Sequence, residues 1–65
     1  MLSLDKEVNL TCIETDKVAK GKIVRIQGNR VDVALDQGGL LISLYMKKPG
    51  LYVGSQSDLE FVMRS

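Results

Sequence analysis

Five basic residues occur between Lys17 and Arg30, and no acidic residue separates them. Lysine and arginine at this density can neutralise the phosphates of a nucleotide or a nucleic acid, and they are equally typical of a solvated strand and loop. Further along, Tyr45 precedes two lysines. An aromatic ring beside cations can stack on a nucleic-acid base, although Tyr45 can also be a packing residue. The candidate residues for binding a ligand or partner are Lys22, Arg25, Arg30, Tyr45, Lys47 and Lys48.

The residue types that usually carry catalysis are scarce in this chain. It has no histidine, so a general base or a nucleophile would have to come from carboxylates, lysines or Cys12. Cys12 falls on the apolar face of a predicted strand, which favours a buried structural thiol. Asp58 and Glu60 share one strand face, and acidic residues in this arrangement are typical of the solvent-exposed face of a sheet. We therefore expect no enzymatic activity, no cofactor and, without a Cys/His cluster, no metal site.

The length, net charge and cysteine count of the chain are typical of a small single domain. Its 65 residues are expected to form one domain, residues 1–65, and the formal net charge of +1 does not favour nucleic acid over other partners. One unpaired cysteine fits a reducing compartment. The start of the chain lacks the pattern of a signal peptide, and no apolar run is long enough for a membrane span. These features predict a cytoplasmic protein that does not contact membranes.

The stretch GKIVRIQGNRVDVAL, residues 21–35, predicts a β-hairpin. Apolar residues alternate with polar ones on both sides of Gly28-Asn29, a pair that suits a two-residue type II′ turn because glycine accepts a positive φ. This turn sets the register of the two strands. The predicted pairs are Gln27 with Arg30, Ile26 with Val31, Arg25 with Asp32, and Val24 with Val33. Arg25 would then form a weak exposed ion pair with Asp32.

The same alternation continues on either side of the hairpin, and no window is typical of a helix. Strands are expected over 7–14, 21–27, 30–35, 40–46 and 57–64, with a short extended piece at 51–53 and turns at 36–39, 47–50 and 54–56. The predicted fold is all-β: a small five- to six-stranded antiparallel meander that closes into a partly open barrel. The expected core residues are Val8, Leu10, Val24, Ile26, Val31, Val33, Leu35, Leu40, Ile42, Leu44, Leu59 and Phe61. Ile13, Ile23, Leu41 and Tyr45 are predicted to face outward as an apolar patch, which suggests self-association.

The order of these elements resembles the PilZ family of bacterial β-barrel domains, over roughly residues 7 to 63. The likeness lies in the first strand VNLTCIE, the central GKIVRIQ and the final YVGSQSDLEF. Family members that bind cyclic di-GMP carry Arg-x-x-x-Arg before the first strand and an acid or amide and a serine in the central motif. This chain begins MLSLDKEV and has Arg25 and Gln27 at the central positions. The resemblance thus implies a regulatory or adaptor barrel that acts through protein contacts, and the two missing motifs count against cyclic di-GMP as a ligand.

A weaker resemblance is to OB-fold RNA-binding domains of the ribosomal-protein type. The matching stretches are Gly21–Ile26, Val31–Val33, Gly39–Ser43 and Val53-Gly54. This resemblance implies single-stranded nucleic acid as the ligand, with Tyr45, Lys47 and Lys48 as its contacts. A third interpretation needs no family: a structural module that docks on a protein partner or on a second copy of itself through an exposed strand edge or face.

Overall fold

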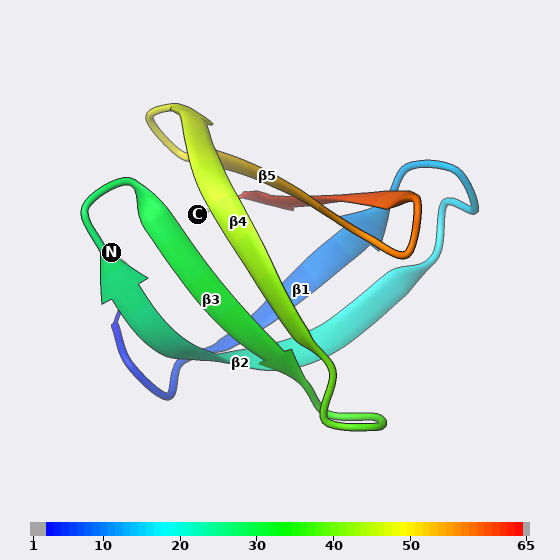
Figure 1. The fold of residues 1–65 in the computed structure, drawn as a ribbon, viewed down its shortest axis with the longest axis horizontal. Helices are drawn as coiled ribbons and strands as arrows, with labels where there is room; N and C mark the ends of the chain where they lie inside the picture. The colour runs from blue at the N-terminus through cyan, green and yellow to red at the C-terminus, as the bar shows by residue number, and fades with distance from the viewer. Residues whose placement is uncertain (1–2, 65) are drawn as a thin grey trace.

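The computed structural model describes residues 3–64, which form six antiparallel strands in a closed ring (Figure 1). The strands are β1 (Glu7–Cys12), β2 (Val18–Gln27), β3 (Arg30–Leu35), β4 (Leu41–Lys48), β5 (Leu51–Gln56) and β6 (Leu59–Arg64). Each strand pairs with the next, and β6 returns to β1 through the pairs Thr11–Val62 and Cys12–Phe61. The predicted all-β antiparallel barrel is confirmed, with six strands. In residues 3–64 there is no helix, and hence none that could cross a membrane.

Alternate residues of every strand fill the inside of the ring, as the period of two requires. Cys12 is buried there, as its place on the apolar face predicted. The fully or largely buried apolar side chains are Leu10, Cys12, Ile23, Val31, Val33, Ile42, Leu44, Phe61 and Met63, with Val8, Leu35, Tyr52 and Leu59 packed against them. The core therefore draws on all six strands, and the outward faces remain for other contacts.

The central hairpin confirms three of the four predicted pairs and corrects the fourth. Gly28 has φ 54°, which fits the first central position of a type II′ turn. A bulge between Ile23 and Arg25 shifts the register, so that Ile23, and not Val24, lies opposite Val33. A bulge adds one residue to a strand and so reverses the faces of the residues before it. Ile23 is therefore completely buried, whereas Val24 is 46% exposed.

Two further members of the predicted core are exposed. Ile26 is paired with Val31 as expected, but it lies close to the Gly28-Asn29 turn and stays 38% exposed. Leu40 belongs to the turn before β4 and is also exposed. The outward positions predicted for Ile13, Leu41 and Tyr45 are confirmed, and that of Ile23 is wrong.

The connection between β5 and β6 differs from the expected one. Residues 54–56, predicted as a turn, are part of β5, and the turn is made by Ser57 and Asp58. Both have positive φ, 54° and 64°, as a two-residue type I′ turn demands. Gly54 has another role, because a Cβ atom placed on it would lie 2.1 Å from the carbonyl oxygen of Ser43. Only glycine lets β5 cross β4 this closely.

Candidate functional site

Arg30, Asp32 and Ser43 form a polar cluster on the outside of the barrel. Arg30 and Asp32 are two residues apart on β3 and so share its outer face, and Ser43 of β4 is the register partner of Asp32. The Arg30 Nε donates to Oδ1 of Asp32 at 3.1 Å, and Nη2 lies 3.4 Å from the Ser43 hydroxyl. Although it faces outward, Asp32 is only 4% exposed.

This environment keeps the Asp32 carboxylate ionised. Burial raises the pKa of Asp32. The hydrogen bonds from Ser43 and Arg30 and the charges of Arg30 and Arg25 lower it by more, so the pKa lies below its usual value. Conversely, the hydrogen bond to Asp32 raises the pKa of Arg30. The charge of Arg30 is thus matched within the protein, which leaves it less available for an external anion.

The expected ion pair of Arg25 with Asp32 is corrected by these contacts. The backbone register is as predicted, with Arg25 opposite Asp32, but the salt bridge joins Asp32 to Arg30. Arg25 directly follows the bulge at Val24, and bulges re-aim the side chains beside them. Arg25 contributes through its charge alone.

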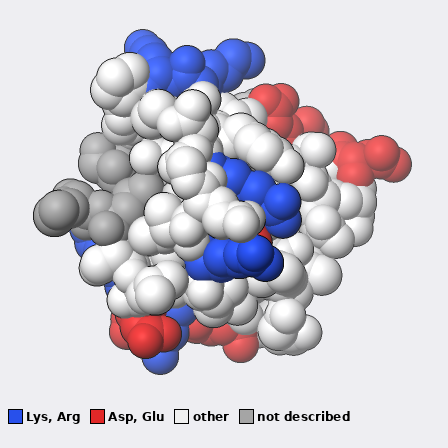
Figure 2. All heavy atoms as spheres, turned by 60° about the vertical axis from the view of Figure 1, so that its left-hand side comes forward, with Lys and Arg blue, Asp and Glu red and all other residues white. Residues whose placement is uncertain are grey.

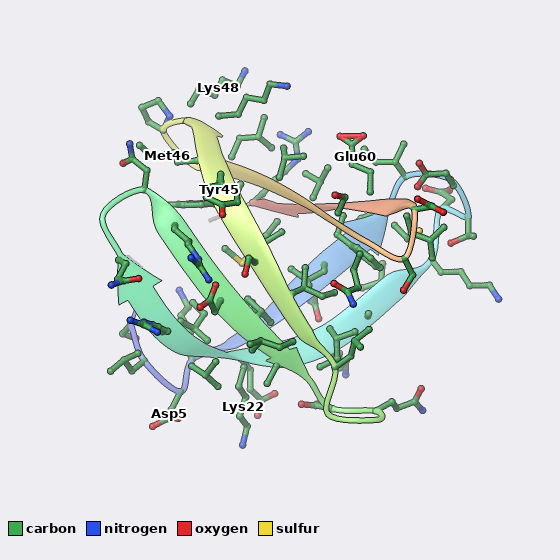
Figure 3. The ribbon with its side chains drawn as sticks, viewed as in Figure 1. Asp5, Lys22, Tyr45, Met46, Lys48 and Glu60 are labelled. Atoms are coloured by element: carbon green, nitrogen blue, oxygen red, sulfur yellow. The ribbon has the colours of Figure 1, made fainter. Side chains whose placement is uncertain are left out.

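The structure brings only some of the predicted binding residues together. Arg30 and Tyr45 are register partners on β3 and β4, and the Tyr45 side chain is 56% exposed. Lys22 and Lys48 lie toward opposite ends of the barrel, with Tyr45 between them (Figure 3), and Lys47 sits beside Lys48 at the end of β4. On the face drawn in Figure 2, Lys and Arg side chains form separate groups with uncharged side chains between them. The six residues therefore do not form one basic site.

A row of outward side chains crosses the barrel instead. Successive register pairs join Thr11 to Val62, Val62 to Val53, Val53 to Tyr45 and Tyr45 to Arg30. We call these five residues the outer row. Its two valines are half-buried, and Tyr45 stands exposed beside them. Ile13, also exposed, lines a hollow with Thr11 and Val62 at the far end. The row gives the barrel an apolar strip that ends in an arginine.

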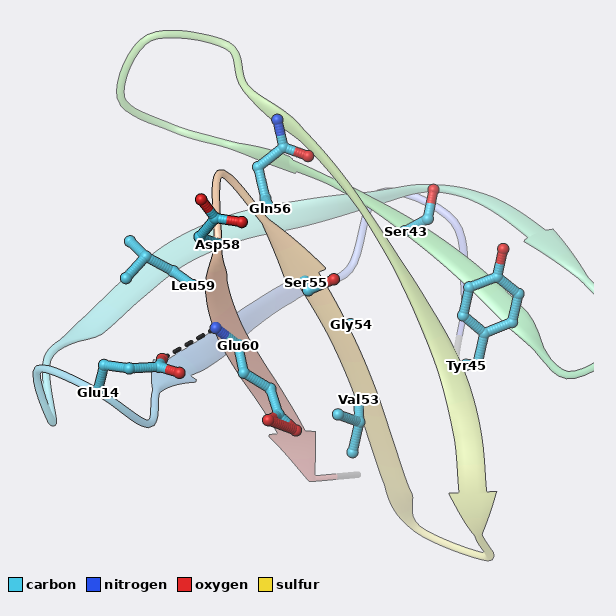
Figure 4. A pocket seen from close by; sticks show the side chains of 10 residues that line it. All are labelled: Glu14, Ser43, Tyr45, Val53, Gly54, Ser55, Gln56, Asp58, Leu59 and Glu60. Carbon is cyan, nitrogen blue, oxygen red and sulfur yellow. Dashed lines mark hydrogen bonds between the residues drawn. The ribbon is translucent and has the colours of Figure 1, made fainter.

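A groove of about 800 Å³ runs beside the outer row, along β5 (Figure 4). It lies where the pairing of β4 with β5 ends, because Tyr45–Val53 is the last pair at that end of the two strands. One side is formed by Ser43 and Tyr45 of β4. The other carries three carboxylates, on Glu14, Asp58 and Glu60, and the lining is completed by Val53, Gly54, Ser55, Gln56 and Leu59. We call this feature the β5 groove.

Glu14 is fixed at the edge of this groove by the backbone of β6. Its Oε1 accepts a hydrogen bond from the amide of Glu60 at 2.9 Å, and the neighbouring amide of Ile13 donates to the Glu60 carbonyl. The Glu60 amide lowers the pKa of Glu14, so this carboxylate is held in its charged form. Asp58 occupies the turn between β5 and β6, at the same side of the groove.

The β5 groove was not predicted from the sequence. The sequence pattern indicates only a solvated strand face at Asp58 and Glu60, and it marks Glu14 in no way. Glu14 reaches these two acidic residues only because β1 pairs with β6. The residue pattern of either strand alone does not reveal that pairing. Tyr45 was the one groove residue that the sequence indicated, through its place beside Lys47 and Lys48.

Comparison of this chain with protein-family models, with curated proteins and with solved structures finds no match. The likeness to PilZ and OB-fold domains therefore rests on the quoted residues. The outer row and the β5 groove are the features of the barrel from which a function can be inferred.

Proposed function

We propose that this protein is a non-catalytic binding module, a PilZ-like regulatory or adaptor barrel that acts through contacts with another protein. The observation that carries the proposal is the outer row, where exposed Tyr45 stands beside half-buried Val53 and Val62. Tyrosine is enriched at the centres of protein interfaces, where it buries a large area at a small entropic cost. Half-buried valines beside such a ring supply a rigid apolar floor.

The charge arrangement favours a protein over a nucleic acid as the partner. Phosphate backbones bind where several cations converge. Here Arg30 is engaged by Asp32, Lys22 and Lys48 lie toward opposite ends, and carboxylates line the groove beside Tyr45. A cyclic dinucleotide carries two phosphates and meets the same obstacle, because the buried Asp32 is the register partner of Arg25 and the salt-bridge partner of Arg30.

Selection from a displayed library of random peptides, with the immobilised barrel as bait, tests the proposal. We expect sequences to be enriched, and their binding to fall about 30-fold in Tyr45→Thr, the loss of a strong interface anchor. Threonine, like tyrosine, is favoured in strands, so the fold should survive at this exposed position. Lys20→Thr, also at an exposed strand position, is the matched control and should bind as the unaltered protein does.

The result that contradicts the proposal is the absence of any enriched peptide, or enriched peptides that bind Tyr45→Thr equally well. Sedimentation of the barrel alone decides whether the partner is a second copy. A dimer that Tyr45→Thr converts to monomer would assign self-association to the outer row. A monomer would leave a different protein as the partner.

A further inference from the structure

We propose that the β5 groove binds an extended, basic segment of the partner protein, with its lysine or arginine side chains directed at the carboxylates of Glu14, Asp58 and Glu60. This inference rests on the proposed function and adds the chemistry of the partner. It commits to one ligand class, because the groove follows one strand and carries three carboxylates along one side.

The shape of the groove favours an extended chain. Its floor follows β5, through Val53, Gly54 and Ser55, and so runs along the strand direction. The outward positions along this floor carry only a valine and a serine. Tyr45 of β4 lies on one side of this floor and Glu60 of β6 on the other (Figure 4). An extended backbone can lie along this floor, parallel to β5, as a partner strand does.

The charges of the groove select the sign of the ligand. Three carboxylates line one side, and that of Glu14 is held in place by the Glu60 amide at 2.9 Å. The cation that reaches the opposite side is Arg30, whose Nη2 contacts the Ser43 hydroxyl and whose charge is offset by Asp32. Basic side chains are attracted to such a surface, and phosphates or acidic peptides are repelled.

The two sides also complement the two parts of a basic side chain. Lysine and arginine have apolar stems that cover hydrophobic surface while the charged head stays in water. The stem would pack on Val53 and Leu59, and the head would reach the carboxylates. The Tyr45 ring can further attract a cation through its face. These contacts explain why an apolar strip and an acidic wall lie side by side.

Two short blocked peptides are the probes for a titration of the ¹⁵N-labelled barrel. In one, lysine alternates with valine, and in the other glutamate replaces each lysine. We expect the lysine peptide to shift the amide signals of Val53, Ser55 and Glu60 at low salt, and the glutamate peptide to shift none of them. The double variant Asp58→Asn with Glu60→Gln should weaken the lysine peptide about fivefold, the loss expected for two exposed ion pairs.

Glu7→Gln is the matched control, because Glu7 is an exposed carboxylate on β1 outside the groove. It should leave the affinity unchanged. Asparagine tolerates the positive φ of position 58, and Glu14 is left intact because its carboxylate holds β6. The spectrum of each variant without peptide reports whether the barrel has kept its fold.

Three results would overturn the inference: no shift with the lysine peptide, equal binding of the glutamate peptide, or signals that move on another face. Its failure is separable from failure of the proposed function. Enriched display peptides that need Tyr45 but are neutral, and that bind the double variant unchanged, would refute the basic ligand and support the binding module.

Discussion

Arg30 and Asp32 are joined by a salt bridge of 3.1 Å, two residues apart on the outer face of β3. Asp32 is nearly buried in this outward position, beneath the guanidinium and beside Ser43. The pair ties β3 to β4 and removes one arginine from the set of free cations. The same salt bridge thus stabilises the barrel and makes Arg30 less available to an anionic partner.

Replacement of Arg30 tests this pairing through stability. We expect Arg30→Ala to lower the urea midpoint of unfolding, because it leaves the buried carboxylate of Asp32 with one strong donor fewer. Arg25→Ala is the control, since Arg25 acts on Asp32 through its charge alone. Its midpoint should change much less. If the midpoint fell equally in the two variants, the salt bridge of Asp32 to Arg30 would be contradicted.

The low pKa of Asp32 predicts a dependence of stability on pH. A folded-state pKa below the unfolded value stabilises the protein above the unfolded value of about 3.9, and this stabilisation is lost as pH falls through the folded pKa. The free energy of unfolding should therefore fall more steeply below about pH 4 in the unaltered protein than in Asp32→Asn. Glu14 is present in both proteins, so its contribution cancels. Parallel pH curves would show that Asp32 is not stabilised by its neighbours.

The bulge at Val24 predicts an inversion between two adjacent residues. Ile23→Val removes one buried methylene and should cost about 0.5–1.5 kcal/mol of unfolding free energy. Val24→Thr changes an exposed side chain and should cost less than about 0.5 kcal/mol. Denaturant unfolding of the two variants decides between the bulged register and the unbroken one. A larger loss at Val24 would favour the unbroken strand.

The crossing of β5 over β4 predicts that Gly54 tolerates no side chain. Gly54→Ala would bring its Cβ against the Ser43 carbonyl and the Leu44 side chain, and we expect a loss of about 1–3 kcal/mol. Ser55→Ala, one residue further on an exposed position, should cost less than about 0.5 kcal/mol. Thermal unfolding measures both. An alanine at position 54 without effect would mean that the strands do not touch there.

The all-β class and most turns could be predicted because each depends on neighbouring residues. Gly28-Asn29 sets a type II′ turn by the φ that glycine allows, and alternation then assigns Val31 and Val33 to the core. The bulge could not be predicted, since Ile23 and Val24 are equally apolar. Only the packing of the closed ring decides which of them is buried.

The candidate site depended still more on contacts between distant segments. Tyr45 and Arg30 were identified individually, by residue type, but their adjacency follows from the pairing of β3 with β4. The sequence suggested that Gly54 marks a turn, and the true reason for a glycine lies on another strand, at Ser43. Glu14 reaches the groove only because β1 closes on β6.

Titration of the ¹⁵N-labelled barrel with three ligands in turn tests the central claim, a binding module for proteins, most directly. The ligands are a peptide enriched by display, cyclic di-GMP and a short single-stranded RNA. The claim predicts that the peptide alone shifts the amide signals of Tyr45, Val53 and Val62 in a saturable manner. Saturable shifts with the RNA or with cyclic di-GMP, and none with the peptide, would contradict it.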